Sequence, residues 1–269
     1  TRRILKANPN DELISVTQND NNNHCTCTKC SAIFKEAESH GAPMIRFVNR
    51  LAEELEDEYP NVKIETLAYM FSTDVPKVTR PHKNVIIQLC SLDMCCGHAL
   101  SDLSCDTNQR FRDQIEGWRE VTDNLYIWYY AVEFTGNARN APFMNFDALY
   151  DTYALFMQSN VKGIFNQAYT NQDSYEFGAL RAYLLSKMMW NPFMSEEEFN
   201  AHIDEFLMLY YGEGWESVRI VLEMTNESSD LNGCWTNNFD RPWNTYNEDY
   251  FLENYHEIRA HIEDAYAKA

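Results

Sequence analysis

Short apolar runs that stop abruptly at polar or acidic residues recur five times in the first two thirds of the chain. Segments with helical spacing of apolar residues lie between them, and this alternation predicts βα units with parallel strands. Enzymes built on α/β barrels place their chemistry directly after such strands. The predicted strands cover residues 13–17, 62–71, 84–90, 125–134 and 162–167.

The intervening helices are predicted from apolar residues that recur three and four positions apart. Residues 31–59 show this spacing, but Gly41, Ala42 and Pro43 are expected to divide them into two helices. Further helices are expected at 105–121, which carries Phe111, Ile115 and Trp118 on one face, and at 146–160.

The last third of the chain changes to an all-helical pattern. Ser195 is a predicted N-cap, and Glu198 stands where a capping box needs it. We therefore expect a partial barrel over residues 1–190 and a helical region over residues 191–269 that packs on it. The predicted helices cover residues 174–190, 195–211, 215–228 and 246–268.

The number of strands limits the fold class. A complete (β/α)8 barrel has eight strands, and the pattern supplies five. The prediction is thus an α/β fold that forms the C-terminal portion, about five βα units, of a TIM-type barrel, followed by a helical C-terminal region. The missing units are expected in an upstream part of the parent chain that completes the barrel.

The net charge of the chain narrows the classes of molecule that it can be expected to bind. The 269 residues include 41 acidic and 22 basic side chains, for a formal net charge of -19. Nucleic acid is disfavoured as a partner, because binding it requires clustered cations that neutralise phosphates. The chain has no apolar run of about 18 residues that would predict a transmembrane segment. No export signal is visible, and any such signal is expected upstream.

Two acidic residues follow predicted strands directly. Asp20 comes after the first strand and Asp93 after the third, where a carboxylate would point into a barrel mouth. Partial burial there can raise the pKa of a carboxyl group to the range of a general acid or base. Turn formation and helix capping are the alternative roles. Glu133, at the end of the fourth strand, is a weaker candidate of the same kind.

Cys25, Cys27 and Cys30 form a C-x-C-x2-C run. Three soft ligands so close together could begin a zinc site, with Cys90, Cys95 or His98 as the fourth ligand. Disulfides and buried thiols remain alternatives, because the usual pair of C-x2-C motifs is missing. The chain contains no glycine-rich phosphate loop and no G-x-S-x-G nucleophile elbow.

Several ordered motifs are similar to those of a bacterial family described as a domain of unknown function (number 4838). Part of that family forms glycoside hydrolase family 163, endo-β-N-acetylglucosaminidases acting on N-glycans. The resemblance implies a glycosidase-like barrel located extracellularly, at the cell surface or in the periplasm. The motifs are Ser15–Asn21 with the cysteine run, Arg46–Asn49, Thr66–Tyr69, Asn84–Ile86, Leu89–Ser91, Leu125–Trp128, Lys162–Phe165, Glu176–Phe177, Leu180–Leu184 and Tyr210–Gly212.

The resemblance also implies roles for single residues. The family pattern has Glu at the position of Asp93, Asp at Tyr129 and Glu at Asn166. In 2-acetamido sugars the substrate amide can act as the nucleophile, so one acid and one polarising group can suffice. Asp93 is then the expected acid/base, and Asp20 the orienting or polarising residue. The residues expected to line the sugar site are Asn19, Tyr69, Trp128 and Gln167.

Three functions are therefore expected from the sequence. The first is a glycoside hydrolase that acts on N-acetylglucosamine-containing glycans and requires no cofactor. The second is a carbohydrate-binding relative that has lost catalysis, as Tyr129 and Asn166 indicate. The third is a structural module whose cysteine run holds zinc. Besides these three, α-glucuronidase-like chemistry is an alternative to the first.

Overall fold

The computed structural model describes residues 1–131, 143–168, 177–234 and 245–268. The chain forms two compact units, and each is described by itself. The predicted boundary after residue 190 stays a prediction. The first unit comprises Thr1–Ser91, Arg112–Tyr129 and Ser159–Phe165, and the second comprises Leu92–Phe111, Tyr130–Gln158 and Asn166–Ala269.

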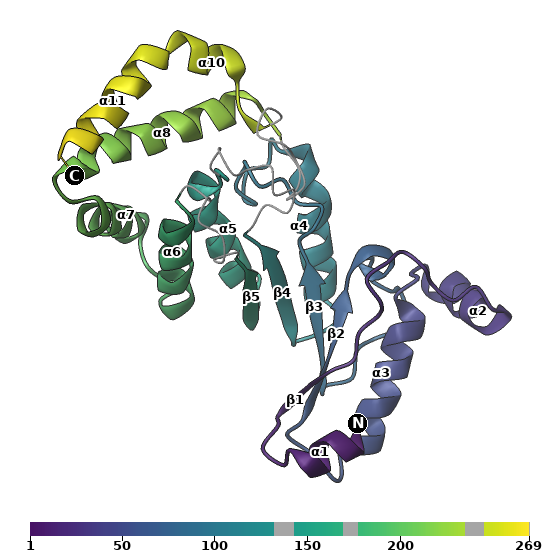
Figure 1. Cartoon of the computed structure of the whole chain (residues 1–269). Helices are drawn as coiled ribbons and strands as arrows, with labels where there is room; N and C mark the ends of the chain where they lie inside the picture. Colours follow the sequence, from purple (N-terminus) through teal and green to yellow (C-terminus); the bar gives the residue numbers. More distant parts are fainter. Residues whose placement is uncertain (132–142, 169–176, 235–244, 269) are drawn as a thin grey trace. The chain divides into compact units, whose positions relative to one another are not determined.

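Five parallel strands lie side by side in sequence order and form a curled half-barrel (Figure 1). This arrangement confirms the predicted α/β fold with five βα units, because consecutive strands of such units pair through helical crossovers. The strands are β1 (Leu13–Ser15), β2 (Lys63–Ala68), β3 (Val85–Cys90), β4 (Leu125–Tyr130) and β5 (Gly163–Gln167).

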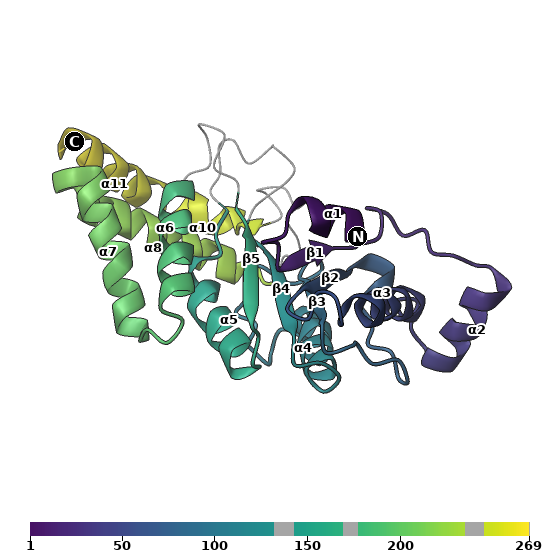
Figure 2. The ribbon, with the colours of Figure 1, turned by 90° about the horizontal axis from the view of Figure 1, so that it is seen from below.

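One face of the sheet is buried along β2, β3 and β4. Along β2, Ile64, Thr66 and Ala68 are buried, and the helix α3 lies against this strand (Figure 2). The parallel register continues the same face through β3 into β4, where Leu125 and Ile127 are buried. Burial of each large apolar side chain contributes about 1.5–3 kcal/mol, so this face forms the core of the first unit.

The opposite face is only partly covered within the first unit. It carries Leu67 of β2 and Tyr126 and Trp128 of β4, which are half-buried. Phe165 of β5 is 47% exposed and meets Trp128 edge-on, with 4.6 Å between the ring centroids. Side chains on alternate strand positions point to opposite faces, so this is the inner face of the half-barrel.

The predicted division of residues 31–59 into two helices is confirmed. Helix α2 covers Thr28–Ala37 and α3 covers Ala42–Leu55. A Cβ atom on Gly41 would lie only 3.0 Å from the backbone oxygen of Ser72, so the close approach of that backbone favours glycine between the two helices.

Helix α4 (Asp106–Arg119) follows the third strand, as predicted. Trp118 is fully buried, and its Nε1 donates a hydrogen bond to the backbone oxygen of Thr73 at 2.9 Å. A buried indole needs such a partner, so this bond fixes the C-terminal half of α4 within the first unit. The fourth predicted helix is α5 (Phe146–Gln158), and a short α1 (Arg2–Ala7) precedes β1.

The chain beyond β5 is helical where it is described, which confirms the predicted change of pattern. The predicted capping box is present: Glu198 N donates to Ser195 Oγ at 3.1 Å, and Ser195 N donates to Glu198 Oε2 at 2.8 Å. Among the described helices, none is both long and apolar enough to span a bilayer. These helices are α6 (Gly178–Trp190), α7 (Glu196–Tyr211), α8 (Trp215–Leu231), α10 (Glu248–Glu253) and α11 (Tyr255–Lys268).

The prediction of one continuous helix over residues 246–268 is wrong. The segment forms α10 and α11, which are separated at Asn254. The Asn254 side chain donates to the backbone oxygen of Tyr250 at 2.9 Å. A short amide side chain competes in this way for backbone groups that would otherwise continue a helix.

Candidate functional site at the ends of β1 and β2

The loops that follow β1 and β2 are joined by one side chain. Gln18 Nε2 donates to the backbone oxygen of Tyr69 at 2.6 Å and to Ser72 Oγ at 2.8 Å. Ser72 closes a tight turn after β2, because its Oγ also accepts from the backbone N–H of Tyr69 at 3.0 Å. The two strand ends are therefore held in a fixed relation within the first unit.

This connection brings two predicted site residues together. The Tyr69 hydroxyl donates to Asp20 Oδ1 at 2.8 Å. A hydrogen bond to an ionised carboxylate is stronger than a neutral one, so it orients the exposed Asp20 carboxylate at the strand end. Its second oxygen can accept a hydrogen bond from a ligand, which fits the predicted orienting role.

A cavity of about 370 Å³ in the first unit is lined in part by the loop after β1, although neither Asp20 nor Tyr69 is among its lining residues. It includes the predicted residue Asn19 and is otherwise formed by residues that the sequence analysis did not select for a sugar site. Its wall contains an aromatic stack: the Phe34 and His40 rings are 3.8 Å apart with 5° between their planes. The other lining residues are Gln18, Asn23, His24, Cys25, Thr26, Cys30, Ser31, Pro43, Met44, Phe47 and Phe71.

Two polar atoms of the lining residues are buried and lack a hydrogen-bond partner in the described part of the chain. They are Gln18 Oε1 and His24 Nδ1. Burial lowers the pKa of His40, and the neighbouring His24 lowers it further. An unsatisfied buried polar atom costs about 1–3 kcal/mol, so these two atoms destabilise the cavity wall as it stands.

The cysteine run lies at the same cavity. The Sγ atoms of Cys25, Cys27 and Cys30 lie within 4.8 Å of one another, and Cys25 and Cys30 line the cavity. Hydrogen bonding, first from the Cys30 backbone, lowers the pKa of Cys27 to about 7. Hydrogen bonding with the Cys25 side chain raises the pKa of Cys30 to about 11.

None of the predicted fourth zinc ligands joins these three thiols among the residues that the structure describes. Cys90 is buried in β3. Cys95 and His98 gather instead with Cys105 and Cys234 in the second unit. The role of the cysteine run in zinc binding stays a prediction.

Asp93 is exposed on the loop that follows β3, where the sequence predicted it. It belongs to the second unit, whereas Asp20 belongs to the first. The structure therefore describes each carboxylate only in its own surroundings. The exposed position leaves the Asp93 carboxylate accessible to a substrate.

The other two predicted sugar-site residues are half-buried. Trp128 lies on the inner face of the half-barrel, in edge contact with Phe165. Gln167 is at the end of β5, where its backbone oxygen accepts from the N–H of Ala131 at 3.0 Å. Glu133 lies outside the described residues.

Tyr129 and Asn166 stand where the family pattern has carboxylates, and both are part of the packing. Tyr129 is 1% exposed and lies on the buried face of β4, opposite to Trp128. Asn166 Oδ1 accepts from the Tyr153 hydroxyl, and Asn166 Nδ2 lies 2.9 Å from Met189 Sδ. Both side chains therefore point away from the inner face of the half-barrel.

The model of a family described as a domain of unknown function (DUF4838) matches residues 1–221, which include the five strands and helices α1 to α7. No curated protein matches the chain.

Proposed function

The chain belongs to the DUF4838 family, and on that premise we propose that it is a glycoside hydrolase-like protein that acts on N-acetylglucosamine-containing glycans. The observation that carries this proposal is the cavity that Gln18 and Asn19 line on the loop after β1. Its volume lies within the range of about 300–1,000 Å³ that small-molecule sites occupy.

The composition of the cavity fits a neutral sugar. The Phe34–His40 stack offers a flat surface of the kind on which sugar rings pack. The lining side chains Asn19, Asn23 and His24 belong to types that hydrogen bond to hydroxyl or acetamido groups. No arginine or lysine is among the described lining residues, so the negatively charged sugar of an α-glucuronidase substrate fits less well.

Hydrolysis is proposed to use the acetamido group of the substrate. Its carbonyl oxygen would attack the anomeric carbon, while Asp93 protonates the departing glycosidic oxygen. Asp93 would then accept a proton from the water that opens the oxazolinium intermediate. One protein carboxyl group is enough for this sequence, and the carboxylates that Tyr129 and Asn166 replace are not required.

A binding protein without catalysis is the second candidate. The placement of Tyr129 and Asn166 favours it, because both side chains are engaged in packing and neither supplies an ionised carboxylate. In that case the cavity would bind a sugar that the protein does not cleave.

Two measurements distinguish these candidates. The first is glycan release from a complex-type N-glycoprotein, read by mass spectrometry, for the protein, Asp93→Asn and the exposed control Asp57→Asn. Hydrolysis predicts release by the protein and the control, and loss of at least about 100-fold in Asp93→Asn. Equal release by all three would remove Asp93 from the mechanism.

The second measurement is calorimetric binding of the N-acetylglucosamine disaccharide. His24→Ala should weaken binding about 10-fold, which corresponds to roughly 1.4 kcal/mol. The exposed control His256→Ala should not change it. Binding without release supports the second candidate, and the absence of both would reject the proposed function.

A further inference from the structure

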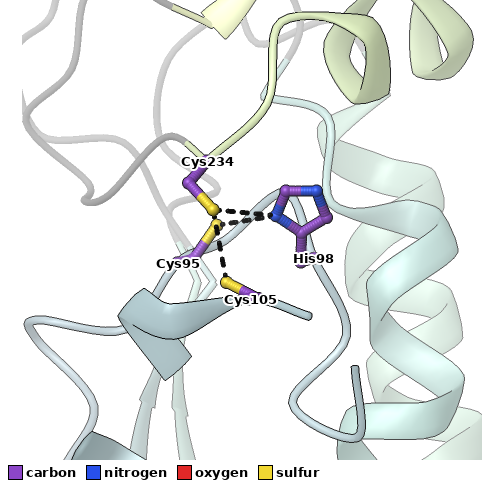
Figure 3. A group of neighbouring side chains, drawn as sticks. All are labelled: Cys95, His98, Cys105 and Cys234. Carbon is purple, nitrogen blue, oxygen red and sulfur yellow. Dashed lines mark hydrogen bonds between the residues drawn. The ribbon is translucent and has the colours of Figure 1, made fainter. Parts of the chain in front are cut away.

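We propose that Cys95, His98, Cys105 and Cys234 form a structural Zn²⁺ site in the second unit, independent of the proposed function. Their side chains converge from the loop after β3, the start of α4 and the segment after α8 (Figure 3). Three cysteines and one histidine are a ligand set that structural zinc sites use.

The spacing of the ligand atoms fits one tetrahedral ion. Cys95 Sγ and His98 Nδ1 are 3.4 Å apart, and Cys234 Sγ lies 3.5 Å from the same nitrogen. Cys105 Sγ and Cys234 Sγ are 3.4 Å apart, and the four atoms lie within 4.8 Å of one another. Zinc bonds of about 2.3 Å to sulfur and about 2.0 Å to nitrogen separate tetrahedral ligands by roughly 3.5–3.8 Å.

The four side chains fit a metal better than they fit a disulfide. The Cys105–Cys234 Sγ separation of 3.4 Å is well above the roughly 2.0 Å of a sulfur–sulfur bond. A disulfide would also leave Cys95 and His98 without a shared role. Thiolate and imidazole ligands in tetrahedral geometry select zinc over the hard cations magnesium and calcium.

A buried asparagine holds two of the ligands in place. Asn108, in the first turn of α4, is fully buried. Its Oδ1 accepts from the backbone N–H of Cys95 at 2.8 Å, and its Nδ2 donates to the backbone oxygen of His98 at 3.2 Å. Metal sites depend on such fixed surroundings, because mobile ligands would lose entropy on binding.

A second bond anchors the same loop to α5. The backbone N–H of Leu100 donates to Thr152 Oγ1 at 3.0 Å, and both residues are fully buried. The loop is therefore preorganised on both sides of His98.

The proposed ion would join distant parts of the chain. Cys105 stands at the start of α4 and Cys234 follows α8, so the ion closes a long loop that contains α4 to α8. Closing a long loop restricts the unfolded chain more than closing a short one. The zinc-bound loop also carries Asp93, which shortly precedes Cys95.

Zinc content tests the proposal directly. The full chain is purified under reducing conditions, equilibrated with Zn²⁺ and freed of loosely bound metal, and zinc is measured by mass spectrometry. A variant with Cys25, Cys27 and Cys30 all replaced by Ser removes the other thiol group. It should retain about one zinc per chain, and the further change Cys234→Ser should lower this to below about 0.2.

Cobalt provides a second readout that does not depend on affinity for zinc. In the variant without Cys25, Cys27 and Cys30, Co²⁺ should give a tetrahedral spectrum with thiolate charge-transfer bands. Cys234→Ser removes one of three thiolates, so these bands should lose about a third of their intensity or disappear. Circular dichroism of Cys234→Ser should remain that of a folded protein, because Cys234 is exposed.

Three results would overturn the proposal. The first is zinc content that Cys234→Ser leaves unchanged. The second is a chain without Cys25, Cys27 and Cys30 that binds no zinc. The third is a Cys105–Cys234 disulfide, detected by alkylation before and after reduction in protein purified without reductant.

Discussion

The two cysteine clusters of this protein, one local and one dispersed, differ in how far apart their members lie in the sequence. Cys25, Cys27 and Cys30 lie close together in the sequence at the start of α2. Cys95, His98, Cys105 and Cys234 come together only when the second unit folds. The local group is conspicuous in the sequence but supplies three ligands, whereas the dispersed group supplies the four that a closed zinc site requires.

The surroundings of the two groups differ as much as their spacing. Cys25 and Cys27 are exposed, while Cys95 and Cys105 are buried. Cys27 stands at the N-cap position of α2, and hydrogen bonding with the Cys30 backbone lowers the pKa of its thiol. Burial raises the pKa of the Cys105 thiol to about 12. The local group therefore resembles a reactive surface feature, and the dispersed group resembles a structural one.

The largest expected difference is in reactivity. With metal removed by a chelator, iodoacetamide at pH 7 should modify Cys27 at least about 100-fold faster than Cys105, because only thiolates react. The pKa of Cys27 is lowered to about 7, so its rate should rise with pH and reach half its maximum near that value. Peptide mass spectrometry over time provides the measurement. Similar alkylation rates for Cys27 and Cys105 would show that the two clusters do not differ in reactivity.

Stability should show the next largest difference. Asn108→Ala removes both hydrogen bonds that hold the Cys95–His98 loop and should lower the free energy of unfolding by about 2–3 kcal/mol. Asn200→Ala is the control, because the Asn200 side chain is half-buried and its Nδ2 donates to a backbone oxygen of its own helix, that of Glu196. Urea denaturation measures the free energy of unfolding of both variants. Equal losses would show that the buried asparagine has no special role.

The smallest effect concerns coupling inside the local group. The hydrogen bond with Cys25 is the largest cause of the raised pKa of Cys30, so Cys25→Ala should lower that pKa. Thiolate absorbance during a pH titration, in a Cys27→Ser background, measures the shift. A pKa of Cys30 that is unchanged or higher would show that the thiols do not interact.

The fold could be predicted because its information is local. Each strand is a short apolar run, and β3 is buried at every position, as is typical of parallel strands. The capping box of α7 needs only Ser195 and Glu198. By contrast, the break at Asn254 depends on one side chain that hydrogen bonds to a backbone carbonyl. The helical spacing of apolar residues continues across this break, so the sequence pattern does not reveal it.

The candidate site could be predicted only where strand ends determine it. Asp20 and Tyr69 meet because the ends of parallel strands lie at one edge of a sheet. The cavity walls at His24, Phe34 and His40 come from α2 and its flanking loops, whose packing has no sequence pattern. For a similar reason, the sequence did not identify Cys234 as a candidate metal ligand. Its partner Cys105 is far away in the sequence, and no spacing motif links the two.

The register of the sheet has a consequence for the order of folding. Ile64 of β2 pairs with Val85 of β3, and only a short connection separates them in the chain. The connection between the paired residues Leu13 and Lys63 is more than twice as long, since it contains α2 and α3, and β1 itself is only 3 residues long.

Closing this longer loop costs about 0.8 kcal/mol more in chain entropy. β2 and β3 should therefore form an early nucleus onto which β1 docks last. During refolding, the backbone amides of β1 should then be the last of the β1–β3 amides to gain protection from hydrogen exchange.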